Sequence, residues 1–185
     1  RDADAFRRTA IRAVGSKQVQ RMVGHQAGRL LAVGADRLDY SKGLPQRLEA
    51  YGRLLERHAE QRRSVQFVQI CAPSREDVDE YRRLRAELGR LARSLNSRFS
   101  TAKWTPLLYS TRAATRTTLA GLYRIARVGV VTPLSDGMNL VAKEYVAAQP
   151  ADDPGVLVLS RLAGAAQELT EALLVDPFDP DAIAD

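Results

Sequence analysis

Short apolar runs alternate along the chain with longer segments of helical spacing. The runs lie at 29–35, 64–72, 105–110, 127–134 and 155–160, and the helical segments lie near 45–59, 76–98, 115–126 and 138–148. The runs lack polar alternation, which is typical of strands buried on both faces, and helices between strands indicate parallel crossover connections. The pattern therefore predicts an α/β fold, a Rossmann-like parallel β-sheet with helices on both faces.

The segment 76–98 is expected to be an amphipathic helix with a charged outer face. Its apolar positions recur at helical spacing and are Val78, Tyr81, Leu84, Leu88, Leu91 and Leu95. Arginines alternate with acids between them, as on a solvated helix face. The net charge of +6 permits an anionic partner, but few aromatics accompany the arginines and no zinc-finger, helix-turn-helix or RNP-type signature occurs. We therefore expect no nucleic-acid partner.

Composition indicates one ordinary globular unit, because 45% of the 185 residues are hydrophobic and 27% are charged. The single cysteine, Cys71, cannot form an internal disulfide, and no apolar run approaches the roughly 18 residues that cross a bilayer. We expect a reducing, cytoplasmic compartment and no membrane partner. The polar opening residues lack both a signal peptide and an initiator methionine. These features suggest a fragment, with an N-terminal helical segment at 1–28 linking a missing domain to the domain at 29–185.

Ligands of such sheets bind outside the carboxyl ends of the strands, and the loop after 127–134 is suited to this. Asp136 and Asn139 offer hydrogen-bonding groups for sugar hydroxyls, and Gly137 permits close approach to the backbone. The helix that follows would present free first-turn amides to an anion. Glu144 has apolar helical neighbours, so its carboxylate needs a partner such as a vicinal diol. An Asp cap followed by an exposed glutamate is the alternative.

The loop after 29–35 carries two cations before a helix that Pro45 is well placed to begin. A cation near a helix N-terminus is unfavourable unless an anion lies between them. Arg37 and Lys42 could clamp a diphosphate, the arginine as a fork and the lysine as a point charge. Asp39 provides the alternative, a purely structural ion pair with one of these bases.

The loop after 64–72 combines a capping signal with another cation. Ser74 and Asp77 have the spacing of a short capping box, which accounts for most of the motif. Arg75 is not explained by capping, and within the first helical turn it would suit a second phosphate. Spacing alone does not decide between the two interpretations.

Four ordered blocks of the sequence resemble the carboxyl-terminal half of the trehalose-6-phosphate synthases. They are "DRLDYSKGLPQRLEAY", "QICAPSREDVDEYRRLR", "LYRIARVGVVTPLSDGMNLVAKEYVAAQ" and "PGVLVLSRLAGAAQEL". The resemblance covers about residues 30–185 and is loose before Gly28. It implies the C-terminal domain of a GT-B glycosyltransferase. Such enzymes transfer glucose from a nucleotide sugar to glucose 6-phosphate with retention of configuration, and this chain corresponds to the donor domain.

The resemblance implies a role for each motif position that would contact the donor phosphates and sugar. Arg37 and Lys42 would grip the diphosphate and are the expected catalytic residues. The positions that would meet the transferred glucosyl group are Asp136, Gly137, Met138 and Asn139. The leaving phosphate would take the acceptor proton in a front-face mechanism, so Asp136 would be a sugar ligand rather than a nucleophile.

The remaining motif positions complete the implied site. Backbone amides of Leu140 and Val141 would approach phosphate, and Glu144 would hold the ribose hydroxyls. Ile70 would lie against the base, and Arg75 would reach the phosphate of the acceptor. The family requires no metal, so no metal ligands and no cofactor are expected.

Departures from the family pattern leave some assignments open. Ser135 stands where an arginine is common, and the segment 110–118 differs near the base pocket. UDP-glucose is the family default, with GDP- or ADP-glucose as alternatives. A missing N-terminal domain would carry most acceptor contacts, so the chain alone is predicted to be inactive; His25 and His58 are expected to be surface residues that do not replace it.

Other functions and assemblies also stay open at this point. The alternatives are a glucosylglycerol-phosphate synthase, a pseudo-glycosyltransferase, and a non-catalytic homologue that retains nucleotide binding. The expected partners are the nucleotide sugar, glucose 6-phosphate and the chain's own N-terminal domain, and the sequence leaves a homo-oligomer open.

Overall fold

The computed structural model describes residues 2–24, 28–75 and 77–185, so His25 lies outside the described residues. Its strands are β1 Leu30–Arg37, β2 Val65–Ala72, β3 Leu107–Ser110, β4 Val128–Val131, β5 Val156–Ser160 and β6 Leu173–Val175. Its α-helices are α1 Ala3–Ala13, α2 Lys17–Val23, α3 Leu44–Arg57, α4 Asp79–Phe99, α5 Arg116–Ile125, α6 Leu140–Ala148 and α7 Pro180–Ala184. The 3-10 turns are η1 Tyr40–Lys42, η2 Ala59–Gln61 and η3 Gly164–Gln167.

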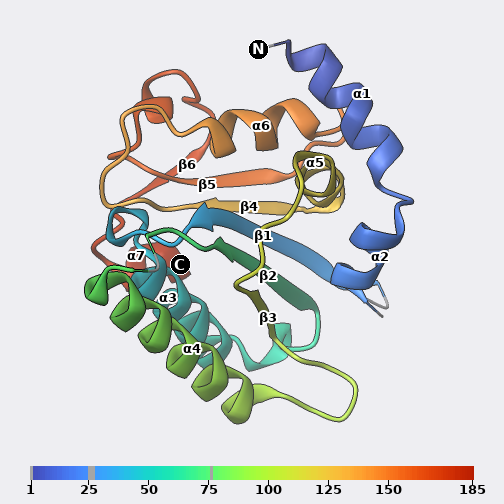
Figure 1. The fold of residues 1–185 in the computed structure, drawn as a ribbon. Coiled ribbons are helices and arrows are strands. Elements are labelled where there is room, and N and C mark those ends of the chain that lie inside the picture. Colours follow the sequence, from blue (N-terminus) through green and yellow to red (C-terminus); the bar gives the residue numbers. More distant parts are fainter. Residues whose placement is uncertain (1, 25–27, 76) are drawn as a thin grey trace.

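The six strands form one parallel sheet in the order β3-β2-β1-β4-β5-β6, with helices on both faces (Figure 1). The predicted fold class is therefore confirmed. The strand order reverses between β1 and β4, because the chain builds outward from β1 to β3 and then returns to the other side of β1. The helices that follow β1 and β4, α3 and α6, lie on opposite faces of the sheet, and sheets of this kind bind ligands at such a point.

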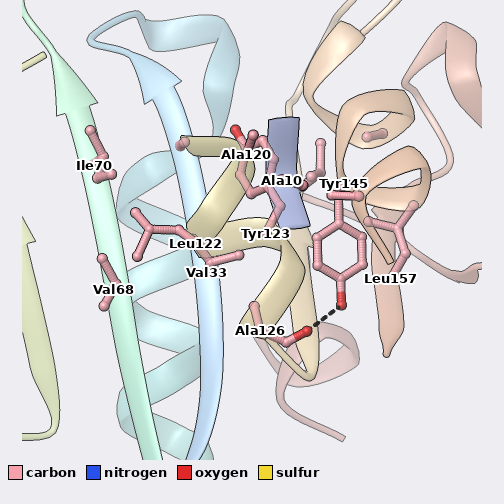
Figure 2. Close-up of a cluster of buried hydrophobic side chains, with 14 of the residues drawn as sticks. Ala10, Val33, Val68, Ile70, Ala120, Leu122, Tyr123, Ala126, Tyr145 and Leu157 are labelled. Atoms are coloured by element: carbon pink, nitrogen blue, oxygen red, sulfur yellow. Dashed lines mark hydrogen bonds between the residues drawn. The ribbon is translucent and has the colours of Figure 1, made fainter. Parts of the chain in front are cut away.

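One face of the sheet is covered by α1, α2, α5 and α6 (Figure 1). Tyr145 of α6 and Tyr123 of α5 meet edge to face in this core, and the Tyr145 hydroxyl donates to the Ala126 carbonyl at 3.2 Å (Figure 2). Gly129 of β4 leaves room for the Tyr145 ring, since a Cβ there would lie 2.8 Å from it. Phe6 of α1 is buried in the same core. The N-terminal helical segment thus packs against α5 and α6, and its role as a link to another domain stays a prediction.

The other face is covered by α3 and α4, with α7 beside α3 (Figure 1). The inner face predicted for the segment 76–98 is correct, because Leu84, Leu88 and Leu95 of α4 are buried. Helix α3 buries Leu48, Tyr51 and Leu55 against the same face of the sheet. Each large apolar side chain buried in this way stabilises the fold by about 1.5–3 kcal/mol. Cys71 is free and buried in this core, and burial raises the pKa of its thiol to about 12.

Two parts of the fold differ from the sequence-based expectation. Strand β6 was not predicted, because it is a three-residue edge strand that is mostly exposed and too short to show a period. Helix α4 begins at Asp79 rather than near 76, since Arg75 has a left-handed φ of 44° and Val78 is extended. The Val78 amide donates to the Arg75 carbonyl at 3.0 Å, which closes a turn before the helix. No helix in the described ranges is long and apolar enough to span a membrane.

Candidate donor site at the strand-order reversal

The loops after β1 and β4 are joined through their backbones. The Ser41 carbonyl in η1 accepts from the amides of Leu134 and Ser135, at 2.7 and 3.2 Å. Gly43 has a φ of 62°, and a Cβ there would lie 2.4 Å from the Thr132 carbonyl oxygen. Only glycine combines this conformation with so close an approach. The two loops therefore form one surface at the carboxyl edge of the sheet.

Lys42 and Asp136 form an ion pair across this surface, with 2.5 Å between Nζ and Oδ2. Their side chains are 15% and 16% exposed, so the pair is largely shielded from water. Burial alone would raise the pKa of Asp136, but the hydrogen bond and charge of Lys42, with the amides of Met138 and Asn139, lower it overall. The structural ion pair considered for Lys42 is thus made with Asp136, across the crevice, rather than with Asp39.

The N-terminus of α6 offers free amides beside this ion pair. Asn139 is left-handed at φ 58° and caps the helix, its Oδ1 accepting from the Ala142 amide at 2.9 Å. Asp136 Oδ1 accepts from the Met138 and Asn139 amides. Among the described residues, the Leu140 and Val141 amides have no acceptor. Two unpaired N–H groups at a helix N-terminus are suited to an anion, although the helix begins at Leu140 rather than at 138. That these amides bind phosphate stays a prediction.

A third loop supports the Asp136 segment from behind. The Gly164 amide of η3 donates to the Asp136 carbonyl at 2.9 Å. A Cβ on Gly164 would lie 2.0 Å from the Gly137 carbonyl oxygen, so the two backbones are in direct contact. Glycine at position 164 allows the two backbones to pack this closely. Glu168, a few residues on, pairs with Lys143 at 2.6 Å.

Arg37 ends β1 at the same edge of the sheet and is exposed. Its side chain makes no ion pair or hydrogen bond to any other described residue. Asp39 is occupied locally instead, accepting from the Ser41 amide and hydroxyl at 2.9 and 2.7 Å. Arg37 is therefore a cation available to a ligand, next to the loop that carries Lys42.

Glu144 has a partner that the sequence did not predict. Its Oε1 lies 3.3 Å from Nε of Arg116, which begins α5, and its side chain is 19% exposed. Both line a hollow of about 390 Å³ together with Phe6, Met138 and Leu140. Glu144 and the first turn of α6 therefore line the same hollow. The Glu144 carboxylate already has a partner in Arg116 of α5, whereas the sequence indicated a diol as its partner.

Ile70 and Arg75 are placed differently from the other predicted site residues. The Ile70 side chain is 2% exposed in the core, so a base could meet only its backbone there. Arg75 lies in the loop before α4 rather than in its first turn, and its guanidinium lies 5.8 Å from the Tyr81 ring centre. The cap expected from Ser74 is not formed, because α4 begins later. The proposed contacts of Ile70 and Arg75 stay predictions.

Arg47 is a buried arginine next to the site that was not predicted from the sequence. Arg47 is 1% exposed in the first turn of α3. Its guanidinium pairs with Asp36 and also donates to Thr132, Gln69 and the Lys42 carbonyl. A signal was present, because position 47 lies three residues after the buried Leu44 and thus on the inner face of α3.

The described residues contain no group of three or more His, Cys, Asp or Glu side chains that could hold a metal ion. The groups at this edge of the sheet are the cations of Arg37 and Lys42, the carboxylate of Asp136 and the free amides at the N-terminus of α6. His58 ends α3 and is exposed, as expected for a surface histidine.

A doubly wound parallel sheet with these groups at its strand-order reversal defines a Rossmann-like domain. The sequence model of glycosyltransferase family 20 matches residues 2–185, and the chain belongs to this family. The trehalose-6-phosphate synthase of Sodalis glossinidius is 53% identical over 154 residues, which are 83% of this chain and 33% of the relative. That of Sinorhizobium fredii is 48% identical over 180 residues, 97% of this chain and 39% of the relative.

Solved structures of the family superpose closely on this chain. A UDP-forming α,α-trehalose-phosphate synthase from Burkholderia xenovorans, in complex with glucose 6-phosphate, gives a TM-score of 0.95 at 49% identity and covers 98% of this chain and 40% of its own. The Escherichia coli enzyme bound with UDP-2-fluoro glucose gives 0.92 at 41% identity, covering 99% and 40%. The chain thus spans between a third and two-fifths of the length of these proteins.

Proposed function

We propose that the chain is the donor-binding part of an α,α-trehalose-phosphate synthase, which transfers glucose from UDP-glucose to glucose 6-phosphate with retention. The observation that carries this proposal is the Lys42–Asp136 pair beside two free helix amides at the strand-order reversal. A diphosphate needs cations and N–H donors, and the sugar beside it needs an acceptor for its hydroxyls. This surface offers both kinds of group at adjacent positions. Relatives named UDP-forming, and one holding glucose 6-phosphate, support the choice of donor and acceptor.

In this proposal the cations and amides act on the diphosphate. Arg37 and Lys42 bind its oxygens, and the amides of Leu140 and Val141 complete the anion site. The same groups stabilise the negative charge that develops on the leaving diphosphate, so they can perform this step without a metal. No cofactor is therefore part of the proposal.

The polar groups of the Asp136 loop act on the transferred glucosyl group. Asp136 and Asn139 hydrogen-bond its hydroxyls, while Gly137 and Met138 contact it through the backbone and an exposed side chain. Asp136 remains a ligand throughout, because the leaving phosphate takes the proton of the acceptor hydroxyl. This arrangement holds the sugar in place next to the bond that breaks.

The outer contacts of the proposal are those furthest from the ion pair. Glu144 holds the ribose hydroxyls, and Arg116 keeps its carboxylate oriented until the nucleotide arrives. The base lies against the backbone at Ile70, and Arg75 reaches the acceptor phosphate. The proposed partners are UDP-glucose, glucose 6-phosphate and an N-terminal domain of the same protein, in a cytoplasmic setting, with a homo-oligomer still open.

The relatives described above carry the name of a trehalose-phosphate synthase, which favours glucose 6-phosphate over the acceptors of the sister enzymes. A non-catalytic nucleotide-binding homologue would not need both Lys42 and Asp136 at the reacting phosphate and sugar. Their pairing in one surface favours an enzyme over a binding module.

Calorimetry of UDP binding in the presence of a metal chelator tests the proposal. We expect binding without metal, and Lys42→Ala or Arg37→Ala should weaken it by about ten- to a hundredfold, the scale of one lost charge-assisted hydrogen bond. Lys103→Ala is the matched control, because Lys103 is an exposed lysine in the loop before β3, at the opposite end of the strands. Equal affinities for Lys42→Ala, Arg37→Ala and the native chain would remove the diphosphate clamp.

A further inference from the structure

Arg47 is a charged side chain in a place that normally excludes charge. It lies in the first turn of α3 and is 1% exposed, at the junction between the helix and the carboxyl ends of the strands. Burying an ion pair seldom stabilises a fold more than apolar residues of the same volume would. A retained buried arginine therefore calls for a role beyond packing.

The Arg47 guanidinium joins segments that are remote in the sequence. Nη1 lies 2.5 Å from Asp36 Oδ2 at the end of β1 and 3.0 Å from Gln69 Oε1 in β2. Nε donates to Thr132 Oγ1, directly after β4, at 3.0 Å, and Nη2 donates to the Lys42 carbonyl at 3.3 Å. The four partners thus come from β1, β2, the loop after β4 and the turn η1.

The backbone is shaped around this network. A Cβ on Gly34 of β1 would lie 2.3 Å from Gln69 Oε1 and 3.0 Å from Nη1 of Arg47. Any larger residue at position 34 would displace the two side chains that meet there. The guanidinium is therefore fixed by partners on several sides, as a group that orients another group needs to be.

We propose that Arg47 is a positioning residue for the donor site, acting through Lys42. This inference rests on the proposed function of Lys42 as a diphosphate ligand. The Lys42 carbonyl, which accepts from Arg47, belongs to the turn that directs the Lys42 side chain toward Asp136. One rigid fork thus ties this turn to the strands beneath it, whereas a lysine at position 47 has a single charged end and could not hold the four partners at once.

A double-mutant cycle with UDP as the ligand tests the inference. The variants are Arg47→Lys, Lys42→Ala and the double variant, and UDP affinity and the urea unfolding midpoint are measured for each. We expect Arg47→Lys to weaken UDP binding about tenfold in the native background and less than about twofold in the Lys42→Ala background. The unfolding midpoint should fall by the same amount in both backgrounds, because the structural loss does not depend on Lys42.

Two further variants keep the cycle decisive. Arg53→Lys makes the same exchange on α3 at a position that contacts Asp181 and Glu49 instead, and it should leave UDP affinity unchanged. Thr132→Val removes one acceptor of Arg47 at nearly constant shape, so it replaces Arg47→Lys if that variant does not fold. Its smaller loss of UDP affinity should also vanish in the Lys42→Ala background.

The possible failures are distinguishable. Equal losses of UDP affinity in both backgrounds would overturn the positioning role and leave the diphosphate clamp intact. No loss in Arg47→Lys, with Lys42→Ala still weakened, would do the same. An unweakened Lys42→Ala would overturn the clamp itself and the inference with it.

Discussion

Asp136 accepts four hydrogen bonds, from Nζ of Lys42, the amides of Met138 and Asn139, and the side-chain amide of Asn139. Its carboxylate is therefore fully occupied before any ligand arrives. In the proposed complex Lys42 turns to phosphate and Asp136 turns to a sugar hydroxyl. In this proposal the Lys42–Asp136 ion pair of the free chain is a placeholder: the diphosphate of the donor replaces Asp136 as the partner of Lys42, and the sugar replaces Lys42 as the partner of Asp136.

Asp136→Asn should affect the binding of the diphosphate and the binding of the sugar in different ways. We expect tighter binding of UDP, by about tenfold, because Lys42 loses its competing carboxylate and the diphosphate loses a repulsive neighbour. Binding of UDP-glucose should improve less or weaken, because the sugar loses its charged acceptor. Calorimetry with both ligands measures the difference. A fall in UDP affinity equal to that for UDP-glucose would contradict the placeholder interpretation.

Glu144 is tested by removing its negative charge while keeping its shape. Glu144→Gln should weaken UDP binding by roughly three- to tenfold, the scale of one charge-assisted hydrogen bond on a partly exposed group. The 2′,3′-dideoxy analogue of UDP should lose little, since it has no diol to accept from. If both ligands lose affinity equally, Glu144 serves to hold Arg116 and not the ribose.

At the scale of elements, the turn η1 and the loop after β4 behave as one unit, because Gly43 sits against the Thr132 carbonyl. Gly43→Ala should destabilise the fold by about 1–3 kcal/mol, since alanine must adopt a left-handed φ and its Cβ has no room. Urea unfolding provides the measurement. Gly15→Ala is the control, because a Cβ there meets nothing within 4 Å and the change should stay within about 0.5 kcal/mol. Similar costs at both glycines would show that the contact is not tight.

Signals carried by neighbouring residues were predictable from the sequence, and signals carried by tertiary contacts were not. Pro45 located the start of α3 to within one residue and hence the position of Lys42. The apolar run before Asp136 located β4, although the strand ends at Val131 rather than at 134. The partnership of Arg116 with Glu144 joins residues of two helices, so no local spacing reports it. Ser74 gave a false signal, because a cap motif cannot reveal that the next residue, Arg75, turns left-handed.

The contacts of Arg47 also could not be predicted from the sequence. Its helical spacing places it on the buried face of α3. A pattern of hydrophobic positions does not predict a buried charge, so it gives no role to an arginine there. Only the meeting of Asp36, Gln69 and Thr132 at one point explains why a charge is tolerated there. The sheet order decides that meeting, and the order is a property of the whole fold rather than of any segment.

For the molecule as a whole, we predict that the 185-residue chain binds UDP but forms no detectable trehalose 6-phosphate from UDP-glucose and glucose 6-phosphate. Holding donor and acceptor in register can supply about 7–11 kcal/mol of a reaction barrier. Arg75, the one proposed acceptor contact in this chain, is exposed, and such a charge pair contributes at most about 1 kcal/mol. A product assay measures the outcome, with a protein of the relatives' full length as the positive control. Turnover by the chain alone, abolished in Arg37→Ala, would show that the acceptor site lies within these residues.

The contact of Gly164 with Gly137 bears on how the donor preference of this surface could change. In the proposed complex the Asp136 loop faces the sugar, and behind it the main chain of Gly164 lies directly against that of Gly137, with no side chain between them to be lengthened, shortened or recharged. A substitution at position 164 could only push the Asp136 loop toward the sugar, and none could enlarge the space by trimming an atom. Adaptation to a different hexose would therefore require changes in side chains that face the sugar from the other side. The Gly137–Gly164 contact would keep the same shape in every such variant.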